Sequence, residues 1–185
     1  MANSVGSTSP TPAPAVGDGY LKCVLCFAVI ERRILLIRKL RGLGQGKING
    51  PGGKVDPGET PLAAAVRETE EEIGVTPTGL HKAGELWFDF ADGMKLHCVV
   101  YRADGIVGEP KETAEAIPLW FPLNAVPYHE MWADDIFWIP LLIEGDRFEG
   151  RFKFDGEKMI EHKIRVSRRP VALEEPVFEE CEGCS

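Results

Sequence analysis

Short runs of apolar, β-forming residues recur along the chain, and turn-forming or charged residues separate them. This pattern predicts strands, the first two of them as an adjacent pair. The expected strands cover residues 21–30, 33–40, 79–90, 94–102, 119–123, 146–154 and 159–166. Residues 41–53 are rich in glycine and predict a loop whose backbone comes close to another group.

Two segments carry the signals of helices. Residues 60–73 start with Thr60 as a cap and Pro61 in the first turn, and Gly74 can end the helix. Residues 134–143 predict a second helix with Asp134 near its start, although Pro140 removes a hydrogen bond inside it. Strands and helices mix without regular alternation, so the predicted fold class is α+β, a sheet that carries helices on its faces.

Length and composition predict one globular domain. The chain has 185 residues, of which 44% are hydrophobic and 27% charged, and this is enough for a single core. We expect a disordered leader at residues 1–19, the domain at 20–166 and a loose tail at 167–185. Without an apolar run long enough for a membrane span and without targeting signals, the expected location is cytoplasmic, with no membrane partner.

The charge and the cysteines narrow the choice of partners. A formal net charge of -8 argues against a nucleic acid polymer but allows a small anion held by local metal ions and amides. Five cysteines at irregular spacing predict reduced thiols. The pairs Cys23/Cys26 and Cys181/Cys184 suggest zinc as an alternative, but residues three apart on a strand point to opposite faces, which disfavours shared chelation.

The strongest chemical signal is a set of glutamates in the first predicted helix. Glu68, Glu71 and Glu72 stand at i, i+3 and i+4, so their carboxylates share one face of the helix. They repel one another without a counter-ion, and magnesium prefers such hard oxygen ligands. A solvated acidic face is the alternative. The fixed spacing of these glutamates from Gly53, Glu59, Arg67 and Gly74 favours a metal site instead.

The segment from Gly53 to Val75, GKVDPGETPLAAAVRETEEEIGV, resembles the box of the Nudix hydrolases, with Thr69 where the family has a bulky aliphatic residue. The resemblance implies an α/β/α sandwich with a mixed sheet. It also implies magnesium, or manganese as a substitute, bound by the three helix glutamates and the Gly53 backbone, and an ion pair between Glu59 and Arg67. Glu72 or Glu115 would accept the proton. For Glu115, as a metal ligand or base, the resemblance is the only support, and an exposed loop glutamate is the alternative.

Four further segments resemble the branch of this family that acts on oxidised purine nucleoside triphosphates. They are NGPGGKV at 49–55, LHKAGELWFDF at 80–90, MWADDIFWIPLL at 131–142 and RFKFDG at 151–156. Two positions depart from that pattern: Leu43 replaces a phenylalanine, and Val24 or Cys23 stands in place of a threonine. The substrate-binding residues that the resemblance implies are Asn49, Lys54, Phe88, Phe90, Met94, Trp132, Asp134, Asp135 and Trp138.

Each of these assignments has a structural alternative. Phe88, Phe90 and Met94 could be plain core, the two aspartates could be helix-start acids, Asn49 a turn residue, and Lys54 a solvated lysine. If these residues form a pocket, the indole rings of Trp132 and Trp138 would stack on a purine. Two buried carboxyls would share a proton, so that one donates and the other accepts a hydrogen bond.

The resemblance therefore implies a function: magnesium-dependent hydrolysis of 8-oxo-dGTP, 2-oxo-dATP and 8-oxo-dATP to the monophosphate and diphosphate by a monomer that cleans the nucleotide pool. Three alternatives stay open. The first is a Nudix pyrophosphatase of another nucleotide, such as an unmodified dNTP, methylated dATP or a dinucleotide polyphosphate. The others are a catalytically silent nucleotide-binding module and an acidic adaptor that works through its tails.

Overall fold

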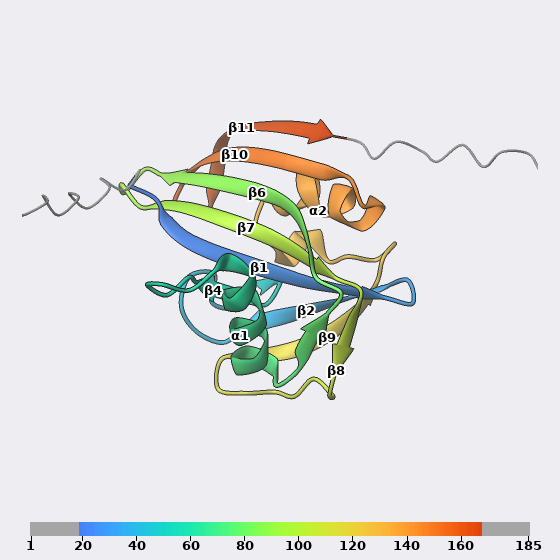
Figure 1. Cartoon of the computed structure of the whole chain (residues 1–185). Coiled ribbons are helices and arrows are strands. Elements are labelled where there is room, and N and C mark those ends of the chain that lie inside the picture. Colours follow the sequence, from blue (N-terminus) through green and yellow to red (C-terminus); the bar gives the residue numbers. More distant parts are fainter. Residues whose placement is uncertain (1–18, 168–185) are drawn as a thin grey trace, which may run out of the picture.

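A nine-stranded mixed sheet forms the centre of the computed structural model, which describes residues 19–167 (Figure 1). Strand β1 runs parallel to β7, and β10 runs parallel to β6, whereas the other pairs are antiparallel. In spatial order the strands are β11 (Lys158–Ser167), β10 (Arg147–Asp155), β6 (His81–Phe90), β7 (Lys95–Ala103), β1 (Leu21–Ile30), β2 (Arg33–Lys39) and β3 (Ile48–Asn49), while β4 (Gly52–Lys54) pairs with β1 and β9 (Ala116–Pro122) with β2.

One helix packs on each face of this sheet. Helix α1 (Pro61–Ile73) contributes Ala64, Ala65 and Ile73 to one apolar cluster. Helix α2 (Asp135–Glu144) contributes Trp138, Ile139 and Leu142 to another. A 3-10 turn, η1 (Tyr128–Glu130), precedes α2, and β5 (Thr76–Thr78) pairs with β8 (Gly105–Val107) in a second small sheet. The predicted α+β class and the sandwich with a mixed sheet are confirmed.

Strand β1 separates the two clusters. Cys23, Phe27 and Val29 belong to the cluster on the α2 side, and Val24, Cys26 and Ala28 to the one on the α1 side. Successive side chains of a strand point to opposite faces, so a nearly continuous apolar run serves both layers. The prediction that Cys23 and Cys26 face opposite ways is therefore confirmed, and Cys26 is a buried free thiol.

The longer predicted elements agree with the structure and the shortest ones were missed. The side chain of Thr60 accepts a hydrogen bond from Ala63 N (3.2 Å), and Gly74 ends α1. Strands β3 and β4 lie inside the predicted loop 41–53. Most of the predicted leader (1–19) and tail (167–185) falls outside the described residues, as do Cys181 and Cys184.

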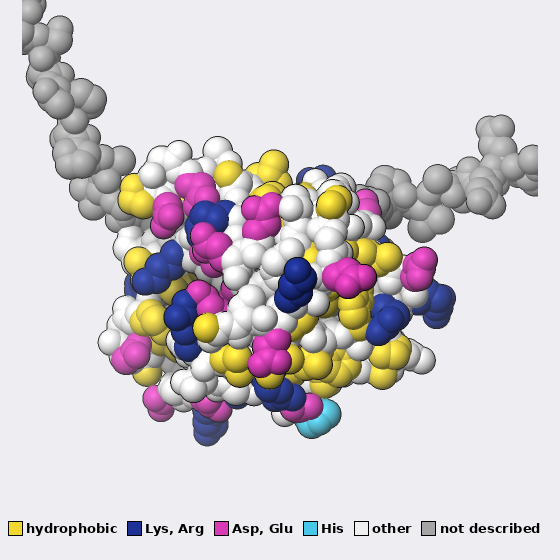
Figure 2. Space-filling model, turned by 90° about the horizontal axis from the view of Figure 1, so that it is seen from below, with side chains coloured by type: hydrophobic (Ala, Val, Ile, Leu, Met, Phe, Trp, Pro, Cys, Tyr) yellow, Lys and Arg dark blue, Asp and Glu magenta, His cyan; other side chains and the backbone are white. Residues whose placement is uncertain are grey.

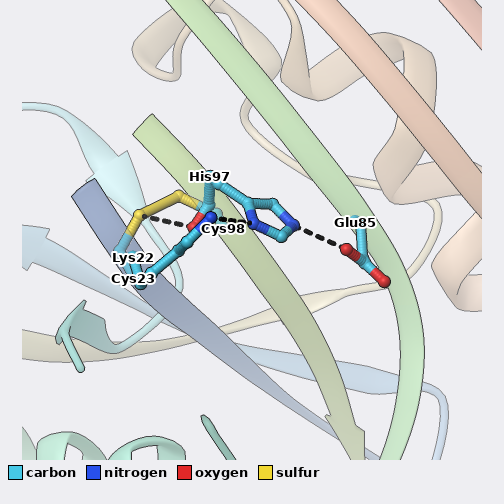
Figure 3. Close-up of a disulfide and its surroundings, with 5 residues drawn as sticks. All are labelled: Lys22, Cys23, Glu85, His97 and Cys98. Atoms are coloured by element: carbon cyan, nitrogen blue, oxygen red, sulfur yellow. Dashed lines mark hydrogen bonds and ion pairs between the residues drawn. A yellow bond between two sulfur atoms is a disulfide. The ribbon is translucent and has the colours of Figure 1, made fainter. Parts of the chain in front are cut away.

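The expectation of reduced thiols is wrong for two cysteines. Cys23 of β1 and Cys98 of β7 form a disulfide, with their Cα atoms 4.5 Å apart (Figure 3). The two residues are direct partners in the parallel register of these strands. Sequence spacing gives no sign of this pairing, because 75 positions separate the two cysteines.

One face of the molecule mixes charges of both signs. Acidic and basic side chains are interspersed with apolar ones on the face shown in Figure 2. Among residues 19–167, no helix is long and apolar enough to cross a membrane. On this face an anionic ligand would therefore depend on local contacts rather than on one broad basic surface.

Candidate active site

Arg67 connects helix α1 to the loop before it. Its Nε and NH2 atoms donate to the two carboxylate oxygens of Glu59, each at 2.9 Å, and NH2 also donates to the carbonyl of Lys54 (2.9 Å). Its NH1 atom donates to Glu68 (2.9 Å) and Glu71 (3.2 Å). The hydrogen bonds from Arg67 hold the pKa of Glu59 at about 2. A two-pronged pair of this kind fixes geometry as well as charge, so the loop and the acidic face keep a defined relation.

Glu72 is the buried member of the acidic face, with 2% of its surface exposed. Lys39 Nζ donates to Glu72 Oε1 (3.2 Å), and the backbone N–H of Gly52 donates to Oε2 (2.9 Å). Burial raises the pKa of Glu72, and the nearby Lys39 ammonium opposes part of that rise. A carboxylate with a raised pKa is a stronger proton acceptor near neutral pH than an exposed one.

Gly53 lies against the carboxylate of Glu68. A Cβ atom at position 53 would be 2.4 Å from the Glu68 carboxylate carbon, closer than such contacts allow. The close approach predicted for the glycine-rich loop therefore exists here. This contact brings the backbone of Gly53 and the carboxylate oxygens of Glu68 together beside α1.

The oxygen atoms of this region are suitable ligands for a hard divalent cation. Glu68, Glu71, Glu72 and the Gly53 backbone offer only oxygen, which is what magnesium prefers. In residues 19–167 as they stand, no three His, Cys, Asp or Glu side chains are arranged to hold a metal ion. Arg67 and Lys39 occupy the carboxylates instead, so a cation would have to replace part of these contacts.

Glu115 lies in the segment before β9, outside the helix. Its side chain pairs with Arg41, and its backbone N–H donates to Thr113 Oγ1 (3.1 Å). Thr113 Oγ1 in turn donates to the carbonyl of Glu72 (2.8 Å). These bonds tie the Glu115 segment to the end of α1 that carries Glu72.

A cavity of about 270 Å³ lies beside this acidic region. Lys39, Gly52, Gly53 and Lys54 line it, and the first two of these bind Glu72. Its lining also contains most of the substrate-binding residues expected from the sequence, namely Asn49, Phe88, Phe90, Trp132, Asp134, Asp135 and Trp138. Half-buried Met94 is not part of this lining in the described chain. One cavity thus joins aromatic rings and buried acids to the Nudix-like box.

Asp134 and Asp135 are the buried acids of this cavity, with 2% and 3% of their surface exposed. Asp134 makes no side-chain cap bond to α2, and accepts a hydrogen bond from Trp138 Nε1 (2.9 Å) instead. Asp135 accepts from the backbone N–H of Trp132 (3.0 Å). Burial raises the pKa of Asp134 to about 6. The pKa of Asp135 is raised well above the usual value by burial and by the Asp134 charge.

The aromatic residues serve both packing and lining. Trp138 is fully buried and contacts Phe27 edge-on, with ring centroids 5.5 Å apart. Phe88 and Phe90 are half-buried, pack on the α2-side cluster and line the cavity. The core and pocket alternatives for these residues are therefore compatible.

Sequence reasoning missed several lining residues. Lys39 ends β2 and Leu96 lies on β7, and neither belongs to a local pattern that would single it out. Phe154 of β10 stands inside the segment RFKFDG but was not named as a pocket residue. The disulfide cysteines Cys23 and Cys98 also line the cavity. Only the strand order of the sheet brings these positions together.

The comparisons with known proteins show the family. The NUDIX domain model matches residues 19–142, so the chain belongs to the Nudix family. Within that family it is 48% identical over 142 residues to the oxidized purine nucleoside triphosphate hydrolase of Danio rerio, an alignment that covers 76% of this chain and 91% of the relative. The protein of the same name from Mus musculus is 41% identical, with 76% and 92% covered.

A solved structure supports the fold. The MutT protein of Bacillus halodurans superimposes with a TM-score of 0.71 and covers 78% of this chain and 97% of its own, at 24% identity. The mixed sheet between two helices is therefore an arrangement that the chain shares with solved MutT-type proteins.

Proposed function

We propose that this Nudix protein hydrolyses oxidised purine nucleoside triphosphates, 8-oxo-dGTP foremost, to the monophosphate and diphosphate with magnesium as the cation. One observation carries the proposal. A single cavity is lined at once by the buried pair Asp134/Asp135, two tryptophans, and the loop that binds the box residue Glu72. The relatives from Danio rerio and Mus musculus, whose names state hydrolysis of oxidised purine nucleoside triphosphates, are similar over three quarters of the chain.

The box residues would act on the phosphate chain. Glu68, Glu71 and Glu72, with the Gly53 backbone, would hold the cation. Once bound, a divalent cation neutralises phosphate charge and lowers the pKa of an attacking water. Arg67 keeps Glu59 and the outer glutamates in place, and Lys54 offers a positive charge at the cavity wall. Glu72 or Glu115 would take the proton from water.

The opposite part of the cavity would select the base. The Trp132 indole offers a face for a purine ring. Asp134 and Asp135 are neighbours in sequence and both buried, so one proton on the pair would provide a donor next to an acceptor. Such a pair can match the altered Watson–Crick edges of both oxidised guanine and oxidised adenine, including 2-oxo-dATP and 8-oxo-dATP.

The decisive measurement is diphosphate release from 8-oxo-dGTP with magnesium. Wild-type protein should turn over, and Glu72→Gln should lower kcat by at least about a hundredfold, because the amide can neither accept the proton nor bind the cation as well. Glu70→Gln is the matched control. Glu70 belongs to the same run but bonds to Thr76, so this variant should keep nearly full activity. No release by wild type, or full activity of Glu72→Gln, would refute the proposal.

A panel of nucleotides separates this proposal from the other Nudix activities. At equal concentration, 8-oxo-dGTP should be hydrolysed faster than dGTP, methylated dATP and a dinucleotide polyphosphate. Tight binding without turnover would indicate a silent binding module instead. We also propose that the protein acts as a monomer on free nucleotides in the cytoplasm. Sedimentation with and without nucleotide tests the oligomeric state.

A further inference from the structure

Lys47 lies directly before β3, at the end of the loop that follows β2. Its Nζ atom is 5.2 Å from the centroid of the Trp132 indole and 3.0 Å from Glu157 Oε2. The lysine side chain is 22% exposed, whereas that of Glu157 is 73% exposed. Trp132 lines the cavity, and Lys47 is not among the lining residues of the described chain. The ammonium therefore supports the indole without taking space from a ligand.

The Trp132 indole is held from several elements. The rings of Phe90 on β6 and Phe154 on β10 contact it edge-on, with centroids 6.3 and 5.6 Å away. The loop packs against its nitrogen, since a Cβ atom added to Gly44 would be 2.9 Å from Nε1. The Lys47 ammonium over the ring adds a charged contact to these apolar and backbone neighbours, and so restrains the indole further.

Lys47 also acts on the acidic pair. The backbone N–H of Trp132 donates to Asp135 Oδ2 (3.0 Å), which links the indole to the carboxylate. The positive charge of Lys47 lowers the pKa of Asp135, against burial and the Asp134 charge, which raise it. Burial, together with the charge of the same carboxylate, raises the pKa of Tyr128 in η1.

A neighbouring ion pair, Arg38–Glu130, helps to fix the loop between β2 and β3. Arg38 of β2 pairs with Glu130 of η1 (2.6 Å) and donates to the carbonyl of Gly46 (2.9 Å). The backbone of Lys47 is fixed as well, because its N–H donates to Gly44 O and its carbonyl accepts from Lys39 N. The side chain of Lys47 thus extends from a backbone that hydrogen bonds hold in place.

We propose that Lys47 is a positioning residue for the base: it fixes the Trp132 indole and places positive charge beside the Asp134/Asp135 pair, and thereby sets how tightly and at what pH the oxidised purine is bound. The inference rests on the proposed function and concerns base recognition only. Lys47 contacts none of the box glutamates in the described structure, so the hydrolytic step should be little affected.

The test is the affinity of the metal-free protein for 8-oxo-dGMP. Binding is measured by tryptophan fluorescence and by calorimetry. Lys47→Met keeps the length of the side chain but removes its charge, and should raise Kd roughly three- to tenfold. Lys47→Arg keeps the charge over the ring and should stay within about twofold of wild type. In turnover of 8-oxo-dGTP, Lys47→Met should raise KM by a similar factor and leave kcat within about twofold.

The pH profile separates positioning from a general loss of packing. Without the Lys47 charge the acidic pair keeps its proton to higher pH. The pH at which 8-oxo-dGMP affinity changes should therefore move upward in Lys47→Met and not in Lys47→Arg. Glu157→Gln, which removes the counter-charge but keeps the lysine, should leave this pH unchanged or move it slightly downward.

Lys153→Met is the matched control. Lys153 forms an exposed ion pair with Glu161 (2.7 Å) on the strands next to the cavity and does not line it. This variant should bind like wild type. If wild type binds 8-oxo-dGMP and Lys47→Met matches its Kd and pH profile, the role of Lys47 is overturned. If wild type fails to bind, the base assignment of the proposed function fails, and the inference falls with it.

Discussion

Neighbouring glutamates of one run occupy different environments. Glu70 bonds to Thr76 on the surface, Glu71 pairs with Arg67 at 56% side-chain exposure, and Glu72 is buried against Lys39. Helical spacing predicts which of these carboxylates share a face. It does not predict which is buried, because burial depends on β2 and β4, which come from elsewhere in the chain. Chemically equal side chains can therefore take on different tasks.

The buried aspartates allow a prediction of how the unfolding free energy changes with pH. The pKa of Asp134 is about 6 in the folded protein and 3.8 as the ordinary value, so the folded state holds the proton more tightly. The contribution of the Asp134 carboxyl to the unfolding free energy should fall as pH rises from about 4 through 6, since ionisation of a buried carboxyl is unfavourable. Asp134→Asn can still accept from Trp138 and should reduce this fall, as measured by urea unfolding across that range.

Asp56→Asn is the control for this series. Asp56 is exposed, so the variant should keep the wild-type dependence on pH. A wild-type unfolding free energy that rises from pH 4 to 6, with the rise lost in Asp134→Asn, would show that the acid is stabilised as the anion and contradict the prediction.

At the scale of elements, sequence predicts what has a local cause. Thr60, Pro61 and Gly74 mark both ends of α1 because capping depends on residues next to the helix. The two- and three-residue strands β3, β4, β5 and β8 are too short for an alternating pattern, so tertiary pairing alone defines them. The box glutamates were found from helical spacing. Lys39 and Lys47 were not, because their partners are 33 and 85 positions away.

The cap of α1 gives a direct test at this scale. Thr60→Ala removes the oxygen that accepts from Ala63 N and should lower the unfolding free energy by about 1 kcal/mol. Thr60→Ser keeps the oxygen and should recover most of that loss. Equal stabilities of the two variants in urea would show that the side chain contributes nothing to the helix start.

At the scale of the molecule, the disulfide joins the two halves of the sheet. Cys23 lies on β1 and Cys98 on β7, the parallel neighbours at its centre. A cross-link between positions this distant in sequence restricts the unfolded chain. In the chain-entropy account, its loss destabilises by roughly 2–4 kcal/mol.

Unfolding in urea with and without a phosphine reductant tests this prediction. The oxidised protein should unfold at higher urea. The double variant Cys23→Ala/Cys98→Ala should show no response to the reductant. Thiol titration of the denatured, unreduced protein should count at least two fewer free thiols than after reduction. An equal count would contradict the cross-link.

Both faces of strand β1 are in use, and this limits which sequence changes the protein can tolerate. The strand supplies Cys23 and Leu25 to the chamber that we assign to the base, while Cys26 and Ala28 back the layer of the acidic helix. An inserted residue near its start would exchange inside and outside for every position after it. Recognition and hydrolysis would then be lost together, so tolerated variation at β1 should consist of replacements in place and never of changes in length.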